Sequence, residues 1–224
     1  MMAILFLLGL TIGERLEYDA KFSFMNIGTM TLQVKDTLRY NDVLCYDIMS
    51  ILKSASGLRW LFSIDDTLEV YTSCDDFIPY FYRERINESG YRRMSDLSFN
   101  HDSNYVSYDD LERMVIEDGT RDLLSFWYYL RSIPMEEGDK IIIDVHSSKE
   151  NHKIECFVRE RERVKTKAGE YETIRVEPQT EGKGIFGAGG GMEIWYSEPD
   201  RLPVQIRASM KVGSVLFRLK GVNY

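Results

Sequence analysis

The feature that most constrains the fold of this chain is an alternation of apolar and polar residues, which recurs in segment after segment between Arg15 and Val222. Successive side chains of a β-strand point to opposite faces, so a period of two places the apolar residues on one face. Leu16 and Tyr18, for example, share a face, and the charged residues beside them point the other way. The pattern predicts antiparallel strands with one face toward an apolar interior and the other toward water.

One segment, residues 121–133, departs from this rhythm and follows a period of about 3.6 residues. Its apolar residues have the i, i+3, i+4 and i+7 spacing of a helix: Leu123, Phe126, Trp127 and Leu130. Thr120 is the expected N-cap, Asp122 lies in the first turn, and Pro134 ends the helix. We expect the aromatic face of this amphipathic helix to plug one end of the sheet, and Trp127 is also a candidate to stack on a ligand.

These patterns together predict an all-β fold in which residues 14–224 form one β-rich domain. The domain is expected to be a single, strongly curved antiparallel meander sheet, either a barrel or a half-barrel, with one helix near residues 121–133. Residues 26–28 are expected to form the first turn. The irregular segment 54–62 is expected to seat Trp60 in the core.

The first thirteen residues, MMAILFLLGLTIG, are apolar almost throughout and resemble the hydrophobic part of a secretory signal. No Lys or Arg precedes this run and no small-x-small cleavage pattern ends it, so an N-terminal strand or a buried tail of the domain is the alternative. The signal interpretation predicts an exported protein that is periplasmic or associated with the outer envelope. No apolar run reaches the roughly 20 residues that a membrane-spanning helix needs.

The formal net charge of −8 provides no general positive field, which nucleic acid or an anionic membrane would need to bind over the whole surface. We therefore expect no nucleic-acid partner. The three cysteines, Cys45, Cys74 and Cys156, form no CxxC pair, which excludes a thiolate metal cluster. A disulfide between Cys45 and Cys74 and three buried thiols are the alternatives.

Residues 182–187, GKGIFG, have the GxGxxG spacing of dinucleotide sites, but a predicted strand follows them where such a site needs a helix. We therefore expect neither a dinucleotide nor any other cofactor. The glycines of this segment are expected to form a rim loop that gates a cavity: Gly184, Gly187 and Gly190. His146 and His152 flank a turn, but no third ligand lies near them, so no metal site is predicted.

A carboxylate and a group of arginines are the candidate polar contacts. Asp66 shares a strand face with Leu68 and is therefore expected to point inward, where it needs partners. Arg83 and Arg92 lie on the two sides of a predicted hairpin turn, and their guanidinium groups suit a carboxylate or a phosphate. The hairpin could supply partners to Asp66, or its arginines could form a cross-strand ladder of ion pairs with neighbouring acidic residues.

Several ordered pieces of the chain resemble a known family: GERLEYDAKF, FSIDDTLEVY, YRERINESGYRR and DLLSFWYYLRSIP with EEGD. They are similar to the bacterial exported family catalogued as domain of unknown function 3108, over about residues 13–222. The resemblance implies a secreted or periplasmic protein with one β-rich domain, and it carries over no catalytic residue. Asp66, Arg83, Tyr91 and Arg92 match its recurring motifs, which adds Tyr91 to the candidate contacts.

The sequence thus favours a non-enzymatic envelope protein whose curved sheet encloses a lipid-like or other apolar ligand. The candidate ligand contacts are Asp66, Arg83, Tyr91, Arg92 and Trp127. The alternative is an envelope scaffold or interaction module that docks another envelope protein through the hairpin of Arg83 and Arg92. A hydrolase whose catalytic residues come from distant parts of the chain is the third hypothesis, although no G-x-S-x-G, HExxH or Cys-His signature is present.

Overall fold

The computed structural model describes residues 9–61, 63–109, 111–180, 191–210 and 213–224. Its strands are β1 (Arg15–Phe22), β2 (Met25–Tyr40), β3 (Val43–Ser54), β4 (Asp65–Ser73), β5 (Pro79–Glu88), β6 (Tyr91–Asn100), β7 (Tyr105–Tyr108), β8 (Glu112–Val115), β9 (Lys140–Ser147), β10 (Glu150–Lys165), β11 (Glu170–Thr180), β12 (Met192–Ser197), β13 (Pro203–Ser209) and β14 (Ser214–Asn223). The helix α1 (Leu123–Ser132) lies between β8 and β9, and a short 3₁₀ turn, η1 (Ser56–Leu58), lies between β3 and β4.

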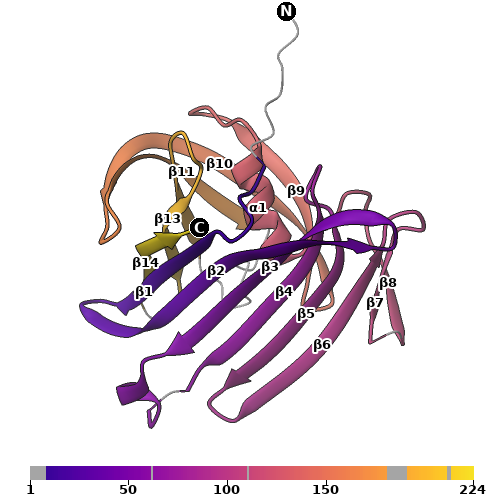
Figure 1. Ribbon diagram of the computed structural model, residues 1–224, viewed down its shortest axis with the longest axis horizontal. Helices are drawn as coiled ribbons and strands as arrows, with labels where there is room; N and C mark the ends of the chain where they lie inside the picture. Colours follow the sequence, from indigo (N-terminus) through magenta and orange to yellow (C-terminus); the bar gives the residue numbers. More distant parts are fainter. Residues whose placement is uncertain (1–8, 62, 110, 181–190, 211–212) are drawn as a thin grey trace, which may run out of the picture.

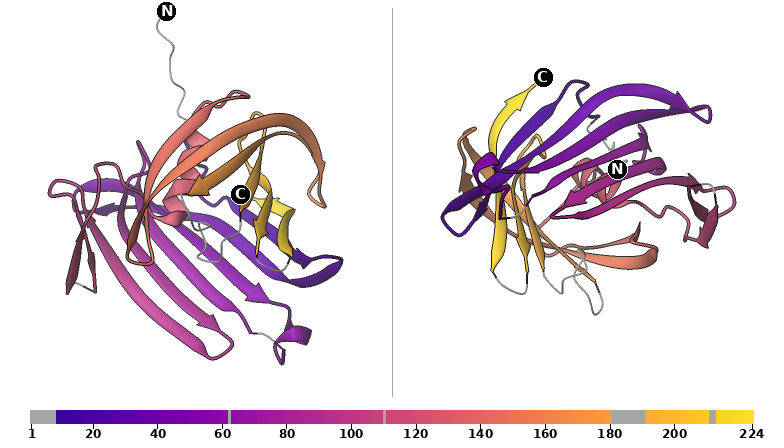
Figure 2. Two further views of the ribbon diagram at one scale, coloured as in Figure 1. Left: turned by 180° about the vertical axis from the view of Figure 1, so that it is seen from behind. Right: turned by 90° about the horizontal axis from the view of Figure 1, so that it is seen from below.

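All fourteen strands belong to one sheet, in the order β8-β7-β6-β5-β4-β3-β2-β1-β14-β13-β12-β11-β10-β9. Each neighbouring pair is antiparallel. The chain builds one half of the sheet outward from β1, crosses through α1 to the other edge, and returns to pair β14 with β1 (Figure 1). The sheet curls around α1 but does not close, because β8 and β9 are its two edges (Figure 2). The prediction of a curved antiparallel meander with one helix is confirmed.

The helix begins two residues later than the sequence predicts. Asp122, not Thr120, is the N-cap: its carboxylate accepts hydrogen bonds from the backbone N–H groups of Leu124 (2.7 Å) and Ser125 (3.1 Å). Arg121 cannot join the helix, because its backbone donates to and accepts from β9 at distances of 2.9 and 2.7 Å. The strand bridge at Arg121 therefore decides where α1 starts.

The helix packs one end of the curled sheet solidly. Phe126 and Leu130 of α1 are fully buried, as are the facing Tyr18 and Tyr196. The two tyrosine hydroxyls are paired: Tyr18 donates to the carbonyl of Pro203 at 2.8 Å, and Tyr196 donates to the carbonyl of Trp127 at 3.2 Å. Burying large aromatic rings with their hydroxyls satisfied makes this part of the interior a conventional core.

An ion pair anchors the C-terminal end of α1. The guanidinium of Arg131 makes two parallel hydrogen bonds to the carboxylate of Glu14, at 2.7 and 2.9 Å, and both side chains are buried. The Nε of Arg131 also donates to the carbonyl of Arg201 at 3.1 Å. These bonds tie α1 to the segment before β1 and to the connection between β12 and β13.

Two local expectations are wrong. Residues 26–28 do not form the first turn, because the chain turns at residues 23–24 and Gly28 lies inside β2, where a Cβ atom would come within 2.3 Å of the carbonyl oxygen of Lys53. Glycine is needed there for the close approach of β2 and β3. Trp60 is not in the core but is 81% exposed, since η1 and its neighbours form a surface connection.

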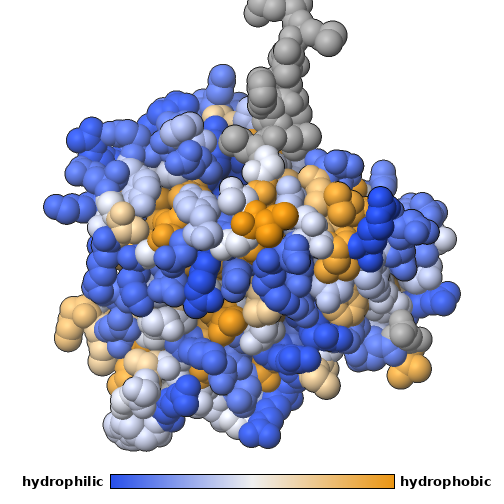
Figure 3. All heavy atoms as spheres, viewed as in Figure 1, coloured by the Kyte–Doolittle hydropathy of each residue, from blue (hydrophilic) through white to orange (hydrophobic). Residues whose placement is uncertain are grey.

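The cysteines are free thiols, so the structure contains no bond between Cys45 and Cys74. Residues 1–8 of the signal-like segment 1–13 lie outside the described residues, as do Gly184, Gly187 and Gly190 of the expected rim loop. Among the helices that the structure describes, none is both long and apolar enough to span a bilayer. The outer face of the sheet is mainly hydrophilic (Figure 3), as the alternation requires.

Candidate functional site

The interior of the sheet is packed around α1 but hollow beside it. A cavity of about 490 Å³ opens there, and its surface is mainly apolar. Its lining comes from β2–β6, α1, the β9–β10 hairpin and β12–β14: Met30, Ser50, Leu52, Asp66, Leu68, Tyr82, Glu84, Ile86, Glu88, Arg93, Leu123, Trp127, Ser147, Ser148, Glu150, His152, Met192, Ile206, Ala208 and Phe217. Pockets that hold small molecules have volumes of roughly 300–1,000 Å³ and mostly apolar walls. The cavity fits this description.

The alternation along each strand explains why these side chains meet. On β5, Tyr82, Glu84, Ile86 and Glu88 all lie in the cavity wall, and the residues between them face outward. The lining residues of β2, β3 and β4 lie close to the strand ends at the β1–β2 and β3–β4 connections. We call this end of the sheet, at which the β1–β2, β3–β4, β5–β6 and β13–β14 connections meet, the rim end.

The helix supplies the inner wall of the cavity through Leu123 and Trp127. The Nε1 atom of Trp127 is shielded from solvent and has no hydrogen-bond partner among the described residues. Buried donors are normally paired, so a polar acceptor in the cavity would stabilise this indole. Among the described residues of α1, only Trp127 and Leu123 line the cavity. Both belong to the apolar face that the helical spacing predicts.

Two carboxyl groups meet at the rim side of the cavity. Asp66 is buried and accepts a hydrogen bond from the backbone N–H of Asn87 at 2.8 Å. Burial raises the pKa of Glu88, and a hydrogen bond with Asp66 raises it further. The partners of Asp66 are thus a backbone amide and a second carboxyl group. The hairpin arginines follow the other alternative, a ladder of ion pairs, because Arg83 pairs with Asp96 and Arg93 pairs with Glu84.

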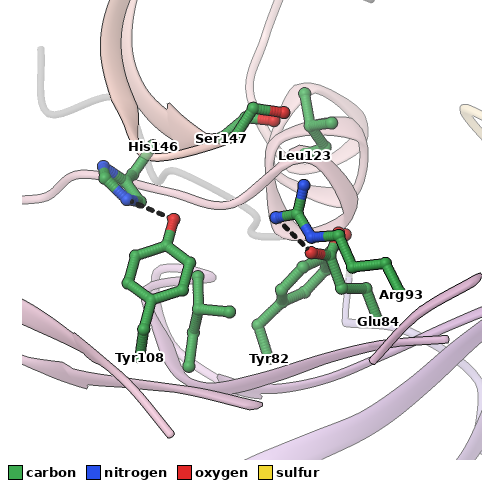
Figure 4. Close-up of a pocket in the computed structure, with 9 residues that line it drawn as sticks. Tyr82, Glu84, Arg93, Tyr108, Leu123, His146 and Ser147 are labelled. Carbon is green, nitrogen blue, oxygen red and sulfur yellow. Dashed lines mark hydrogen bonds and ion pairs between the residues drawn. The ribbon is translucent and has the colours of Figure 1, made fainter. Parts of the chain in front are cut away.

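A second acidic side chain of the wall is neutralised within the protein. Glu84 pairs with Arg93 at 2.5 Å across the β5–β6 hairpin, beside Tyr82 and Leu123 (Figure 4). Burial raises the pKa of Glu84, and the charge of Arg93 opposes this shift. Because Arg93 is already paired, it has little charge left for an anionic ligand.

The two edges of the sheet are joined by side chains close to the cavity. Tyr108 of β7 and His146 of β9 share a hydrogen bond of 2.7 Å (Figure 4), and the other ring nitrogen of His146 lies 2.6 Å from the side-chain oxygen of Asn151. Asn151 in turn donates to the carbonyl of Val115 at 2.8 Å. Burial lowers the pKa of His146, although the bond to Asn151 opposes the shift. We call these contacts the seam.

The predicted site residues divide into two groups. Asp66 and Trp127 line the cavity. Arg83 lies on the outer face, where it binds Asp96 through two hydrogen bonds of 2.7 and 2.5 Å. Tyr91 and Arg92 are exposed at the tip of the β5–β6 hairpin.

Sequence reasoning missed most of the cavity's polar residues. Glu84 and Glu88 are among the acidic neighbours of the hairpin arginines, for which the sequence predicts only ion pairs, and Arg93 is not among the candidate contacts. The period of two predicts the inward direction of Glu84 and Glu88, since both have the same parity as Tyr82 and Ile86 in that strand. No group of three potential metal ligands occurs in the described parts of the chain.

The cysteine and histidine chemistry offers little to catalysis. Burial raises the pKa of Cys45 to about 11 and that of Cys156 to about 12, so both thiols stay protonated at neutral pH. Both ring nitrogens of His146 are engaged in the seam. Across the residues with described positions, no hydrogen bond joins a serine or cysteine to a histidine.

The comparisons with known proteins agree with this architecture. A family model described as "Protein of unknown function (DUF3108)" matches residues 17–220. The fold is similar to that of the β-barrel-like protein of domain of unknown function DUF1849 from Brucella abortus, at 8% identity and a TM-score of 0.63 over 95% of this chain and 97% of that chain. No curated protein sequence matches the chain.

Two other solved structures match over nearly their whole length. One is described as a "putative lipoprotein" from Parabacteroides distasonis, at 11% identity and a TM-score of 0.45, covering 99% of this chain and 100% of that chain. The other is described as a "putative exported protein" with a YmcC-like fold from Bacteroides fragilis, at 12% identity and a TM-score of 0.45, covering 98% of this chain and 99% of that chain.

Proposed function

The chain belongs to the DUF3108 family of proteins of unknown function, and from that premise we propose that it is an exported cell-envelope protein that binds a lipid-like or other apolar ligand without converting it. The observation that carries the proposal is the mainly apolar cavity of about 490 Å³ in the curled sheet. A sheet of this size can enclose a ligand because its walls stand too far apart for side chains alone to fill the interior.

The polar residues of the cavity indicate what the polar end of the ligand should be. Asp66 and Glu88 form a carboxyl pair, and the guanidinium of Arg93 is neutralised by Glu84. A ligand carboxylate or phosphate would therefore meet acidic groups, and the one guanidinium of the described lining is already paired. We infer that the ligand has a neutral polar end, such as a hydroxyl or an amide, whose oxygen can accept from Trp127.

Displacement of a fluorescent apolar probe tests the proposal. The purified protein should bind N-phenyl-1-naphthylamine, and dodecanol should displace the dye more effectively than dodecanoate at pH 8. Ala208→Trp places an indole in the cavity and should abolish dye binding, whereas Ser209→Trp adds the same ring at the next position of β13, outside the cavity lining, and should retain it. Equal dye binding by the two variants would refute the cavity as the binding site.

The two other hypotheses have weaker support. An interaction module that uses the Arg83 and Arg92 hairpin would depend on Arg92 alone, because Arg83 is already bound to Asp96. A hydrolase would need an activated nucleophile, and neither the protonated thiols nor the engaged His146 supplies one. Assays with generic ester and glycoside substrates would test the latter.

A further inference from the structure

Large apolar side chains are exposed at the rim end of the sheet, on connections close to cavity-lining residues such as Asp66 and Glu88. They lie on three successive connections, β1–β2, β3–β4 and β5–β6, which follow one another along the lower left of Figure 1. We call these five residues the rim surface: Phe24, Met25, Trp60, Leu61 and Tyr91. Phe24 is 92% exposed and Trp60 81% exposed, so neither contributes to the core.

The opposite end of the same strands is different. There the β2–β3 turn consists of Asn41 and Asp42, and the β6–β7 turn, residues 101–104, reads HDSN. Single exposed apolar residues, such as Leu44 near the opposite end, are common on any protein, but a group of five on neighbouring connections next to a cavity indicates a contact surface.

The charge around the rim surface is opposite to that of the whole chain. Lys21, Arg59, Arg85 and Arg92 lie on or next to the same three connections, and none takes part in an ion pair within the described residues. Of the nearby carboxylates, Asp65 is paired with Lys53, and Glu88 belongs to the carboxyl pair with Asp66. A protein with a net charge of −8 therefore presents unpaired cations beside the exposed apolar side chains of its rim surface.

We propose that the rim surface docks on a lipid bilayer that contains anionic phospholipids, with the mouth of the cavity facing the membrane. Tryptophan and tyrosine favour the membrane–water interface, where the ring is half buried and its polar atom stays hydrated. Neighbouring lysines and arginines are attracted by anionic headgroups, and that attraction acts over about a Debye length. The net negative charge keeps the rest of the surface away from such a membrane, so the protein docks in one orientation.

The geometry favours a bilayer over a second protein. The apolar residues lie at the tips of separate turns, which can each enter a soft interface, whereas a protein partner needs one continuous, closely packed patch. This proposal goes beyond ligand binding, and it gives an apolar ligand a path between bilayer and cavity that avoids water. Either proposal can fail without the other.

Sedimentation with vesicles tests the docking surface. The full chain should bind phosphatidylcholine vesicles that contain 30 mol% phosphatidylglycerol, and bind pure phosphatidylcholine vesicles much less. Removing one surface cation lowers binding about fivefold, so Arg59→Glu with Arg92→Glu should lower the partition coefficient at least about 25-fold. Phe24→Ser with Trp60→Ser should also release the protein, at any salt concentration.

Matched variants away from the rim surface provide the control. Arg39→Glu with Arg113→Glu makes the same change in net charge away from the rim surface, since Arg39 lies near the β2–β3 turn and Arg113 in the edge strand β8. Leu44→Ser removes a half-exposed apolar residue near the same β2–β3 turn, at the end of the sheet opposite the rim end. These variants should bind vesicles like the unaltered protein, and all variants should bind N-phenyl-1-naphthylamine equally, which shows that they are folded.

Three results would overturn the proposal: no binding of the full chain to anionic vesicles, equal losses in the rim and control variants, or a change of oligomeric state in the rim variants with no effect on vesicles. The last result would assign the rim surface to a second copy of the chain. If the unaltered protein binds anionic vesicles but not the dye, docking stands without the cavity proposal; if it binds the dye but not the vesicles, the cavity proposal stands without docking.

Discussion

Replacing Glu14 with glutamine should destabilise the protein far more than replacing an exposed carboxylate of the same strand region. The change leaves the guanidinium of Arg131 buried without its counter-charge, although its bond to the carbonyl of Arg201 remains. Breaking one side of a buried ion pair costs about 3–5 kcal/mol of unfolding free energy. For a chain of this length, 1 kcal/mol lowers Tm by about 2–4 °C, so Glu14→Gln should lower Tm by about 6–20 °C.

A double-mutant cycle separates the interaction energy of the Glu14–Arg131 pair from the individual contributions of the two side chains. Arg131→Met should cost a similar amount, because it leaves the carboxylate of Glu14 buried alone. The combination Glu14→Gln with Arg131→Met removes both charges and should cost much less than the sum of the singles, with a coupling of about 2 kcal/mol or more. Urea unfolding followed by circular dichroism at pH 7.5 measures all four free energies.

The control is the neighbouring pair of Arg15 and Glu17, at 3.1 Å, whose side chains are 39% and 32% exposed. Exposed pairs contribute about 0–1 kcal/mol, so Glu17→Gln should change stability only slightly. If Glu14→Gln costs no more than Glu17→Gln, or if the losses in the cycle simply add, the ion pair does not anchor the helix. Because α1 carries Trp127 into the cavity wall, Glu14→Gln should also weaken dye binding at temperatures where the protein is still folded.

Two further predictions concern titration and capping. Burial lowers the pKa of His146, so the folded state resists protonation of this side chain. The stability that is present above about pH 6.5 should therefore be lost as the pH falls through the folded-state pKa. His146→Gln should flatten the dependence of Tm on pH between pH 5 and 7.5, and equal slopes for the two proteins would contradict the role of His146 in the seam. Asp122→Ala removes the bonds to Leu124 and Ser125 and should cost about 1–2 kcal/mol, while Asp122→Asn should cost less. Since burial raises the pKa of Asp122, the unaltered protein should lose stability relative to Asp122→Asn as the pH rises above about 4, which parallel urea titrations at pH 4 and 7 would detect.

The regular parts of the fold were accessible from the sequence because each has its own period. Leu16 and Tyr18 face inward as the period of two predicts, and the change to a period of 3.6 located α1 to within two residues. The cap was misplaced because Thr120 and Asp122 are both good capping residues. Only the long-range bridge between Arg121 and Val145 of β9 decides between them, and local patterns carry no signal for such a contact.

Glycine and tryptophan show a similar limit. Gly28 is predicted as a turn residue, because glycine is common in turns, where it allows a positive φ. Glycine is also used where two strands approach closely, and the sequence does not distinguish the two uses. Trp60 was expected inside because large aromatic rings usually are buried. Its exposure becomes meaningful only when Phe24 and Tyr91 are seen on the neighbouring connections, at one end of the sheet.

The cavity is the feature that the alternation of the sequence does not predict. Alternation determines which side chains point inward, and so Asp66 could be placed on the inner face from its shared parity with Leu68. It does not determine how far apart opposite walls stand, because that distance depends on the number of strands, their tilt and the curvature of the sheet. In this chain α1 fills one end of the interior with Phe126 and Leu130, and the sheet stays unclosed between its edge strands β8 and β9. A helix of ten residues cannot fill the length of a sixteen-residue strand such as β2, so the same inward-facing residues that form a core beside the helix form the wall of a cavity beyond it.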